Sequence, residues 1–254
     1  MPVQDLAASL PIVLTCAAAL MLAGAVKGVL ALGLPLVGLP LLTLVVDVPT
    51  AISVLMIPLI LSNLIQAIEG EGTLALLRRF WALILCLIVG TFIGTALFVR
   101  LDHHFLLLTI GVLAIALSTM AILQPHVNVP PRHERWMGPL VGFISGVLGG
   151  MSTLFGPPLA LYVVGLRTTR DTFVKAISLL YLIAALLLTA GGIAQGSTNT
   201  ALLTWSAFAM IPVYIGMLIG RRIRSLIDPE RFRLLVLGVV WLTGANLIRM
   251  GLGF

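Results

Sequence analysis

Apolar segments of about 20 residues recur along the whole chain and are separated by short polar connections, which is the pattern of helices that cross a bilayer core. Charged residues make up only 9% of the chain, against about 25% in a soluble globular domain. The fold class predicted is therefore an all-α polytopic membrane protein. Eight spans are expected: 11–46 (interrupted), 50–68, 77–99, 105–123, 137–166 (interrupted), 173–194, 201–220 and 232–250.

The two halves of the chain resemble each other. With an offset of 118 positions, eight of the 18 aligned positions from Gly24 to Leu41 are identical, against roughly two expected for sequences this apolar. Further along, an offset of 126 aligns Gly90 with Gly216 and Gly94 with Gly220. The chain is therefore expected to be two fused units of four helices.

The expected boundaries are a first transmembrane repeat at residues 1–124, a linker at 125–136 and a second repeat at 137–254. Because four crossings are an even number, both repeats would have the same orientation in the membrane. Parallel repeats of this kind occur in transporters.

Glycine and proline interrupt the first apolar segment of each repeat, as AVKGVLALGLPLVGLP and GVLGGMSTLFGPP. We expect a discontinuous helix that crosses the membrane once, with one half ending near Gly149 and the next starting at Pro157. Gly38 and Pro40 would mark the equivalent break in the first repeat. A simple kink is the alternative reading, as is close helix packing for the Gly-xxx-Gly pairs.

A half-helix that starts within the membrane presents N–H groups and a positive dipole end, which attract anions. Lys27 is the one basic residue deep in an apolar run, and it is expected to bind or neutralise an anion unless it extends to the interface. Asn63 and Tyr181 align under the 118 offset and can donate hydrogen bonds, although helix–helix hydrogen bonds are the alternative. The candidate substrate-binding residues are Lys27, Gly33, Pro35, Gly38, Pro40, Asn63, Gln66, Gly150, Ser152, Thr153, Gly156, Pro157 and Tyr181.

Other chemistry leaves no signature in the sequence. The two cysteines, Cys16 and Cys86, lie in separate apolar segments, and no metal-ligand spacing, phosphate-binding loop or nucleophile motif is present. No cofactor, metal or enzymatic activity is expected. The net charge of +6 comes from short loops, so the expected partners are a small oxyanion and membrane lipid, with a homodimer left open and no nucleic acid.

The loop charges predict the orientation in the membrane. With eight crossings and the N-terminus outside, nine basic residues fall in inside loops and five in outside segments, which favours N-out and C-out by the positive-inside rule. Arg78 and Arg79 fit this arrangement poorly, since it places them outside.

The segment GFISGVLGGMSTLFGPPLALYVVGLRTTRDTFVKA, with the duplicated unit and the early breaks, resembles the sulfite exporter TauE/SafE family of membrane transporters. The first-half segment ALGLPLVGLP departs from the richer glycine cluster of that family. The resemblance implies a permease for small oxyanions in a prokaryotic inner membrane.

Together these features predict a secondary transporter that exports a small anion, sulfite or an organosulfonate, by alternating access. The alternatives are an anion channel, a carboxylate permease and, in another class, a non-transporting membrane enzyme or assembly subunit. Both termini are expected in the periplasm.

Overall fold

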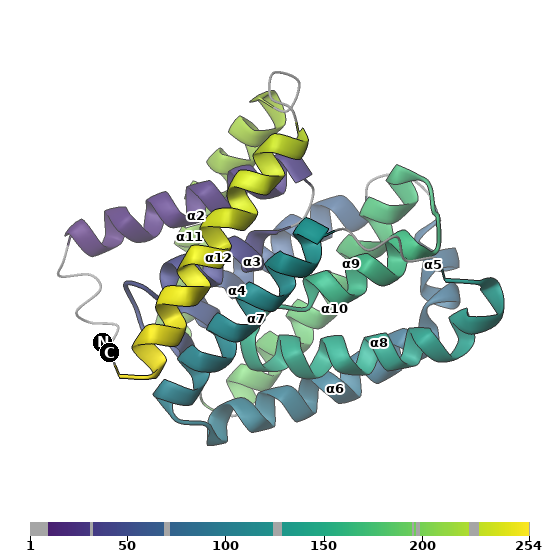
Figure 1. Cartoon of the computed structure of the whole chain (residues 1–254), viewed down its shortest axis with the longest axis horizontal. Helices are drawn as coiled ribbons and strands as arrows, with labels where there is room; N and C mark the ends of the chain where they lie inside the picture. Colours follow the sequence, from purple (N-terminus) through teal and green to yellow (C-terminus); the bar gives the residue numbers. More distant parts are fainter. Residues whose placement is uncertain are drawn as a thin grey trace. The chain divides into compact units, whose positions relative to one another are not determined.

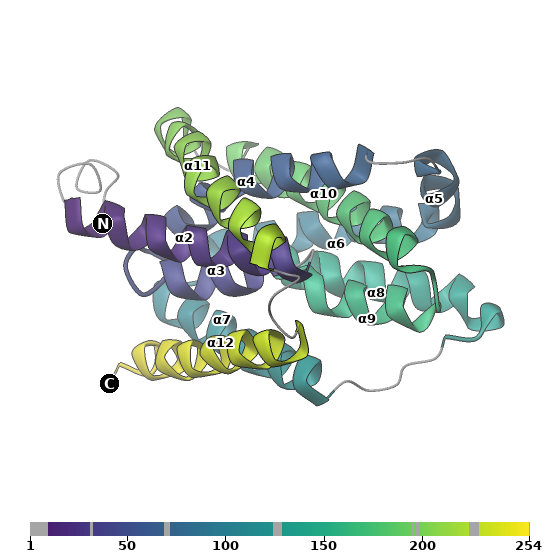
Figure 2. The ribbon, with the colours of Figure 1, turned by 90° about the horizontal axis from the view of Figure 1, so that it is seen from above.

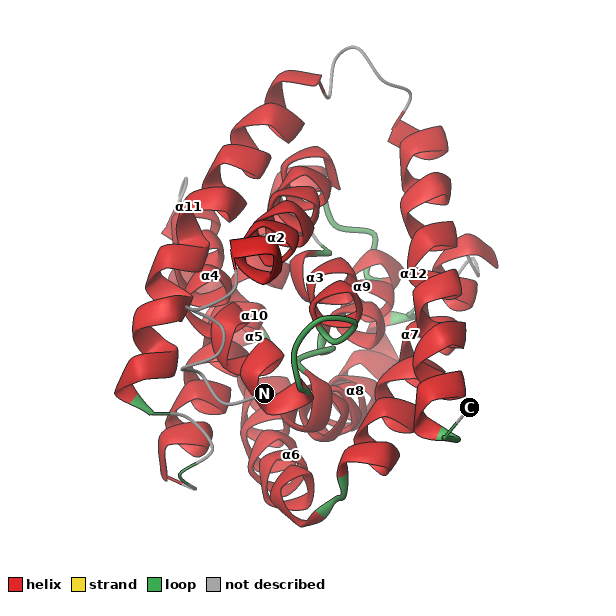
Figure 3. Cartoon of the chain, turned by 90° about the vertical axis from the view of Figure 1, so that its left-hand side faces the viewer, coloured by secondary structure: helices red, strands yellow, loops and turns green. Residues whose placement is uncertain are grey.

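The computed structural model describes residues 10–30, 33–68, 72–123, 129–194, 196, 199–223 and 229–253, and over these residues every regular element is an α-helix (Figures 1 and 3). The helices are α2 (Leu10–Leu30), α3 (Leu34–Leu42), α4 (Val48–Ile68), α5 (Thr73–Arg79), α6 (Trp81–Arg100), α7 (His103–Leu123), α8 (Pro131–Ser152), α9 (Gly156–Gly165), α10 (Arg170–Ala194), α11 (Thr200–Ile223) and α12 (Pro229–Gly251).

The all-helical, polytopic prediction is confirmed at this level. Five of the described helices are long and apolar enough to cross a membrane: α2, α4, α6, α10 over Thr172–Ala194, and α11. The other three predicted spans correspond to α7, to α8 with α9, and to α12. The count of eight spans and their grouping into repeats stay predictions. Of the predicted linker, residues 125–128 lie outside the described part, and α8 already begins at Pro131.

The chain forms two compact units, and each contains segments from both halves of the sequence. Unit 1 comprises Met1–Pro58, Leu101–Gln124 and Gly196–Phe254, and unit 2 comprises Leu59–Arg100 and Pro125–Gln195. Helices α2, α3, α7, α11 and α12 therefore belong to unit 1, whereas α5, α6, α8, α9 and α10 belong to unit 2. Helix α4 contributes to both.

In unit 1, α3 folds back along α2 instead of continuing it (Figure 2). A Cβ atom on Gly38 would lie 3.4 Å from the Cβ of Ala23, whereas these residues would be about 22 Å apart in one straight helix. The reversal occurs at Gly33, whose φ of 98° is in the left-handed region that glycine adopts without strain. Helices α2 and α3 thus form a helical hairpin.

Unit 2 contains a second helical hairpin, formed by α8 and α9. The N–H of Val129, just before α8, donates a 2.9 Å hydrogen bond to the carbonyl of Gly165 at the end of α9. The hydroxyl of Tyr162 on α9 donates to the carbonyl of Glu134 in the first turn of α8, at 3.3 Å. The end of α9 therefore lies beside the start of α8.

These hairpins correct the expectation that the second half of each interrupted helix continues in the direction of the first. In the second hairpin, α8 extends to Ser152 and α9 begins at Gly156, close to the predicted break. In the first, the predicted break is wrong, because Gly38 and Pro40 lie inside α3. Helix α3 starts with Pro35 in its first turn, where a proline has no N–H to leave unpaired.

Glycines allow α6 and α8 to pack closely and in parallel in unit 2. A Cβ atom on Gly146 would lie 2.5 Å from the carbonyl oxygen of Leu87 and 2.8 Å from the backbone nitrogen of Thr91. One turn further along both helices, Gly150 faces the carbonyl of Thr91 in the same way. The interpretation of the Gly-xxx-Gly pairs as packing devices is confirmed for this helix pair.

Helices α2 and α11 in unit 1 pack in the same parallel way, with Gly24 against the carbonyl of Val213 and Gly28 against that of Met217. The third large contact, between α7 and α12, is antiparallel, since Gly111 meets Gly244 whereas Gly251 meets the carbonyl of His104 (Figure 2). The Gly-xxx-Gly pairs of α2 and α11 are therefore packing devices as well.

The helix ends and contacts match between the hairpins at an offset of 122 positions, not 118. Helix α2 ends at Leu30 and α8 at Ser152, whereas α3 begins at Leu34 and α9 at Gly156. The helix contacts agree with this offset. Gly24 and Gly28 meet Val213 and Met217 of α11, whereas Gly146 and Gly150 meet Leu87 and Thr91 of α6, and the contacted residues of α11 and α6 differ by the offset of 126. The sequence alignment was therefore one helical turn out of register at the hairpins.

Pro58 interrupts the hydrogen bonds of α4 at the boundary between the two units. The carbonyl of Val54 would accept from residue 58 in a regular helix, but proline has no N–H. The hydroxyl of Ser206 on α11 donates to that carbonyl at 2.9 Å and accepts a 2.9 Å hydrogen bond from the N–H of Ile57. Ser206 thus supplies a donor to the carbonyl that the proline leaves without a helical partner.

Candidate functional site

The turn between α8 and α9 is buried and carries polar side chains. Thr153 adopts a left-handed φ of 63°, which is unusual for a β-branched residue. The Ser152 hydroxyl donates to the carbonyl of Leu148 at 2.7 Å and accepts a 3.3 Å hydrogen bond from the N–H of Leu154. The Thr153 hydroxyl is buried and has no hydrogen-bond partner among the described residues, so the turn holds a hydroxyl that the fold itself does not use.

The start of α9 lies against Tyr181 of α10. The Tyr181 hydroxyl occupies the position that a side chain on Gly156 would need, with its Cζ 3.2 Å from the site of that Cβ atom. Tyr181 is only 4% exposed. Glycine at residue 156 is therefore what allows the phenol group to reach the first turn of α9.

The expectation that this helix end presents several free N–H groups needs correction. Of the first residues of α9, Pro157 and Pro158 have no N–H, and the N–H of Phe155 already donates to the carbonyl of Thr153 at 3.0 Å. Only the N–H of Gly156 remains for a ligand in the first turn. The side chain of Pro157 lies outside the described part. Side-chain donors must therefore supply most hydrogen bonds at this helix end.

Polar side chains on α4 and α10 meet in unit 2. The Ser178 hydroxyl donates a 2.9 Å hydrogen bond to Oε1 of Gln66, and both residues are buried. Asn63, one turn before Gln66, donates from Nδ2 to the carbonyl of Leu59 at 2.7 Å. Lys175, one turn before Ser178 on α10, is 6% exposed. Two helices thus build what we call the polar face, which consists of Gln66, Lys175, Ser178 and Tyr181.

The remaining candidates lie in unit 1. Lys27 on α2 is 2% exposed, so its side chain is enclosed and does not extend to solvent. Gly33 forms the turn of the hairpin and Pro35 the first turn of α3. Gly38 packs against Leu55 and α2, and the carbonyl of Pro40 accepts a hydrogen bond from Thr43. Their roles in substrate binding stay predictions.

Of the thirteen predicted residues, four lie in two pairs in unit 2. Gly156 lies against Tyr181, and Ser152 and Thr153 belong to one turn. Gly150 instead packs against α6. Lys175 was missed because its neighbours Arg167 and Arg170 made it resemble a loop charge. The spacing of Lys175, Ser178 and Tyr181 by three residues in an apolar helix is the signal that reveals it.

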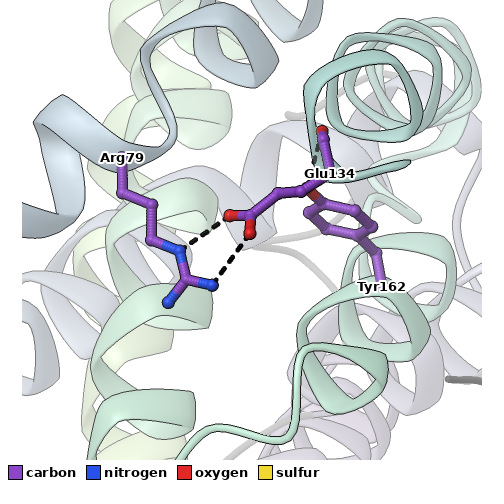
Figure 4. Close-up of polar contacts among 3 residues, drawn as sticks. All are labelled: Arg79, Glu134 and Tyr162. Atoms are coloured by element: carbon purple, nitrogen blue, oxygen red, sulfur yellow. Dashed lines mark hydrogen bonds and ion pairs between the residues drawn. The ribbon is translucent and has the colours of Figure 1, made fainter. Parts of the chain in front are cut away.

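An ion pair stabilises the end of the second hairpin, away from its turn (Figure 4). Arg79 of α5 donates two hydrogen bonds to the carboxylate of Glu134, at 2.7 and 3.1 Å, and this hydrogen bonding raises the pKa of the Arg79 guanidinium. Tyr162 reaches the backbone of the same glutamate. The ion pair thus ties α5 to the hairpin.

Comparison with known protein families gives one match, which extends over most of the chain. The model of the family described as sulfite exporter TauE/SafE matches residues 16–247. No curated protein and no solved structure matches the chain. The matched segment includes the second hairpin, the polar face and all of the first hairpin from Cys16 onward.

Proposed function

The chain belongs to the sulfite exporter TauE/SafE family of membrane transporters, and we propose that it is a secondary transporter that exports sulfite or an organosulfonate across a prokaryotic inner membrane. The family match over residues 16–247 is the observation that carries this proposal. The buried polar side chains in both units support it, since polar groups in membrane helices commonly line a substrate path.

We propose that transport proceeds by alternating access without a nucleotide. A negative-inside membrane potential favours the exit of an anion by about 2.3 kcal/mol per charge per 100 mV. Because the potential drives the anion outward, this scheme requires no acidic proton relay. Among the described residues that are buried, none is an aspartate or glutamate. Export driven by the potential alone agrees with that composition.

The helical hairpins support an inverted arrangement of the two halves, in place of the parallel one expected from sequence. If each hairpin returns to the side on which it starts, only α4, α6 and α7 cross in the first half, and only α10, α11 and α12 in the second. Three crossings are an odd number, so the second half starts on the opposite side. Inverted repeats are a common transporter plan.

The basic residues agree with this threading better than with eight crossings. One side then has two arginines, Arg100 and Arg249. The other side has eleven, of which residue 224 lies outside the described part: Arg78, Arg79, Arg132, Arg135, Arg167, Arg170, Arg221, Arg222, Arg224, Arg231 and Arg233. By the positive-inside rule the side with eleven is cytoplasmic and both termini are periplasmic. Arg78 and Arg79 no longer conflict with the rule.

Single cysteines test this threading at two of the connections where six and eight crossings disagree. In a chain with Cys16→Ala and Cys86→Ala, we expect Ala75→Cys on α5 to be protected from a membrane-impermeant maleimide in intact cells. We expect His104→Cys to be labelled there, because both positions are exposed on the protein. Labelling of Ala75→Cys with protection of His104→Cys would instead support helices that cross once at each break.

The function is tested by efflux of radiolabelled sulfite from proteoliposomes that contain the purified chain, with the voltage set by potassium and valinomycin. We expect saturable efflux that follows the voltage and is inhibited by organosulfonates. Rapid efflux without saturation would identify a channel, and inhibition by carboxylates alone a carboxylate permease. Efflux no faster than from empty liposomes would leave the enzyme or assembly-subunit alternative.

A further inference from the structure

Three polar side chains interrupt the apolar surface of α10, and they share one face of that helix. Lys175, Ser178 and Tyr181 follow one another at intervals of three residues, so they lie within an arc of about 120°. They are 6%, 0% and 4% exposed, respectively. All three side chains are therefore enclosed by the protein, and each can donate a hydrogen bond from the same face of α10.

Contacts fix where this face of α10 points. Ser178 donates to Gln66 of α4 at 2.9 Å, and the Tyr181 hydroxyl lies at Gly156, the first residue of α9. The face therefore meets both α4 and the positive end of α9 within unit 2. Because Oε1 of Gln66 accepts the hydrogen bond from Ser178, the other polar atom of this side-chain amide is Nε2, which is a donor.

The chemistry of this neighbourhood favours an anion. Its donors are the ammonium of Lys175, the phenol of Tyr181, the amide of Gln66 and the N–H of Gly156. Among the described residues, the fully buried polar set contains lysine, glutamine, asparagine, serine and threonine but no carboxylate. A small ion with several oxygen acceptors could be held by these donors, whereas a cation would meet the charge of Lys175.

A separate observation, in the turn before α9, also points to a ligand at this place. The hydroxyl of Thr153, in the turn that leads into α9, is buried and has no hydrogen-bond partner among the described residues. Buried polar groups nearly always have a partner. An oxyanion at the start of α9 would provide an acceptor close to this turn.

We propose that Lys175 is the cation of an oxyanion-binding site in unit 2, which the polar face, Thr153 and the start of α9 complete. This inference rests on the proposed transport function and names the residues that would hold its substrate. It differs from the expectation drawn from the sequence, which gave the role of the cation to Lys27. The ligand class is a tetrahedral or pyramidal oxyanion of the size of sulfite.

The test is equilibrium binding of sodium sulfite to the purified full chain in nanodiscs, by calorimetry. Lys175→Gln is expected to raise the Kd at least about tenfold, since a hydrogen bond to a charged group is lost. Lys175→Arg keeps the charge and is expected to stay within about threefold of wild type. Arg167→Gln, an exposed position just before α10, is the matched control and should leave the Kd unchanged.

A second variant protects the test against a fold defect in Lys175→Gln. Tyr181→Phe keeps the ring and removes only the hydroxyl, and it should raise the Kd about threefold or more. Unchanged affinity in both Lys175→Gln and Tyr181→Phe, with normal efflux by wild type, would overturn this site while the transport function stands. A wild-type chain that neither binds nor exports sulfite would overturn both.

Discussion

A methyl group added at Gly156 is expected to reduce sulfite efflux by about tenfold to a hundredfold, and loss of the Tyr181 hydroxyl in the same chain is expected to restore much of it. The Cβ atom of Gly156→Ala would collide with that hydroxyl. Overpacking of this kind costs about 1–3 kcal/mol, which converts to that range of rates if the collision moves the start of α9.

The double variant separates a steric cause from any other. In Gly156→Ala with Tyr181→Phe, the nearest remaining atom is the ring Cζ, 3.2 Å from the added Cβ, a gap that a small shift of the ring can widen. We therefore expect the two changes to be strongly non-additive in a double-mutant cycle of efflux rates. Tyr181→Phe alone should lose less than Gly156→Ala, because it removes one hydrogen-bond donor and moves no backbone.

Thermal unfolding of the same purified variants provides the control. If Gly156→Ala lowers efflux while its Tm stays close to that of wild type, the effect belongs to the site and not to the fold. Additive losses in the double variant would contradict the proposed collision. They would mean that Gly156 and Tyr181 act separately.

Composition and segment length were enough to predict the fold class, because a bilayer restricts a chain this apolar to membrane helices. The second break was also predicted to within a few residues, since Gly156 and Pro157 can start a helix but can hardly continue one. What the residue types could not reveal is whether the chain continues in the same direction after the break or reverses. The same glycines and prolines permit a helix that resumes and one that turns back. Only contacts decide between them, such as that of Gly38 with Ala23 in the first hairpin and that of Val129 with Gly165 in the second.

The register error has a simple physical origin. Helix α8 carries a glycine every four residues, at Gly142, Gly146 and Gly150, because a glycine in each turn keeps one face open to α6. An alignment can therefore place Gly24 and Gly28 on either neighbouring pair of these glycines. Identities favoured the wrong pair, and this moved the predicted first break to Gly38 instead of Gly33.

The candidate site was predictable only in part, for a related reason. Ser152, Thr153 and Gly156 follow from the break itself, and the structure places them in one turn or at the start of α9. Lys175 could not be recognised by a rule that counts basic residues near helix ends as loop charges. Its burial depends on which helices cover the first turns of α10, and this information lies in the packing of unit 2.

Gly146→Ala is expected to destabilise the chain by about 2–4 kcal/mol. The added Cβ would lie 2.5 Å from the carbonyl oxygen of Leu87, 2.8 Å from the backbone nitrogen of Thr91 and 3.0 Å from the carbonyl carbon of Gly90. All three are backbone atoms, so no side chain can rotate away, and α6 and α8 must separate. At about 2–4 °C per kcal/mol for a chain of this size, the Tm should fall by roughly 5–15 °C.

Gly238→Ala is the matched control, because the same substitution there lies within α12 and has no atom within 4 Å of the added Cβ. Alanine has the higher helix propensity, by up to about 1 kcal/mol, so the Tm of this variant should stay level or rise. Measuring the Tm of both variants in the same detergent separates the effect of the helix contact from the effect of helix propensity. A Tm for Gly146→Ala at or above that of Gly238→Ala would mean that α6 and α8 do not pack through their glycines. It would also remove the evidence from contacts for the register of 122.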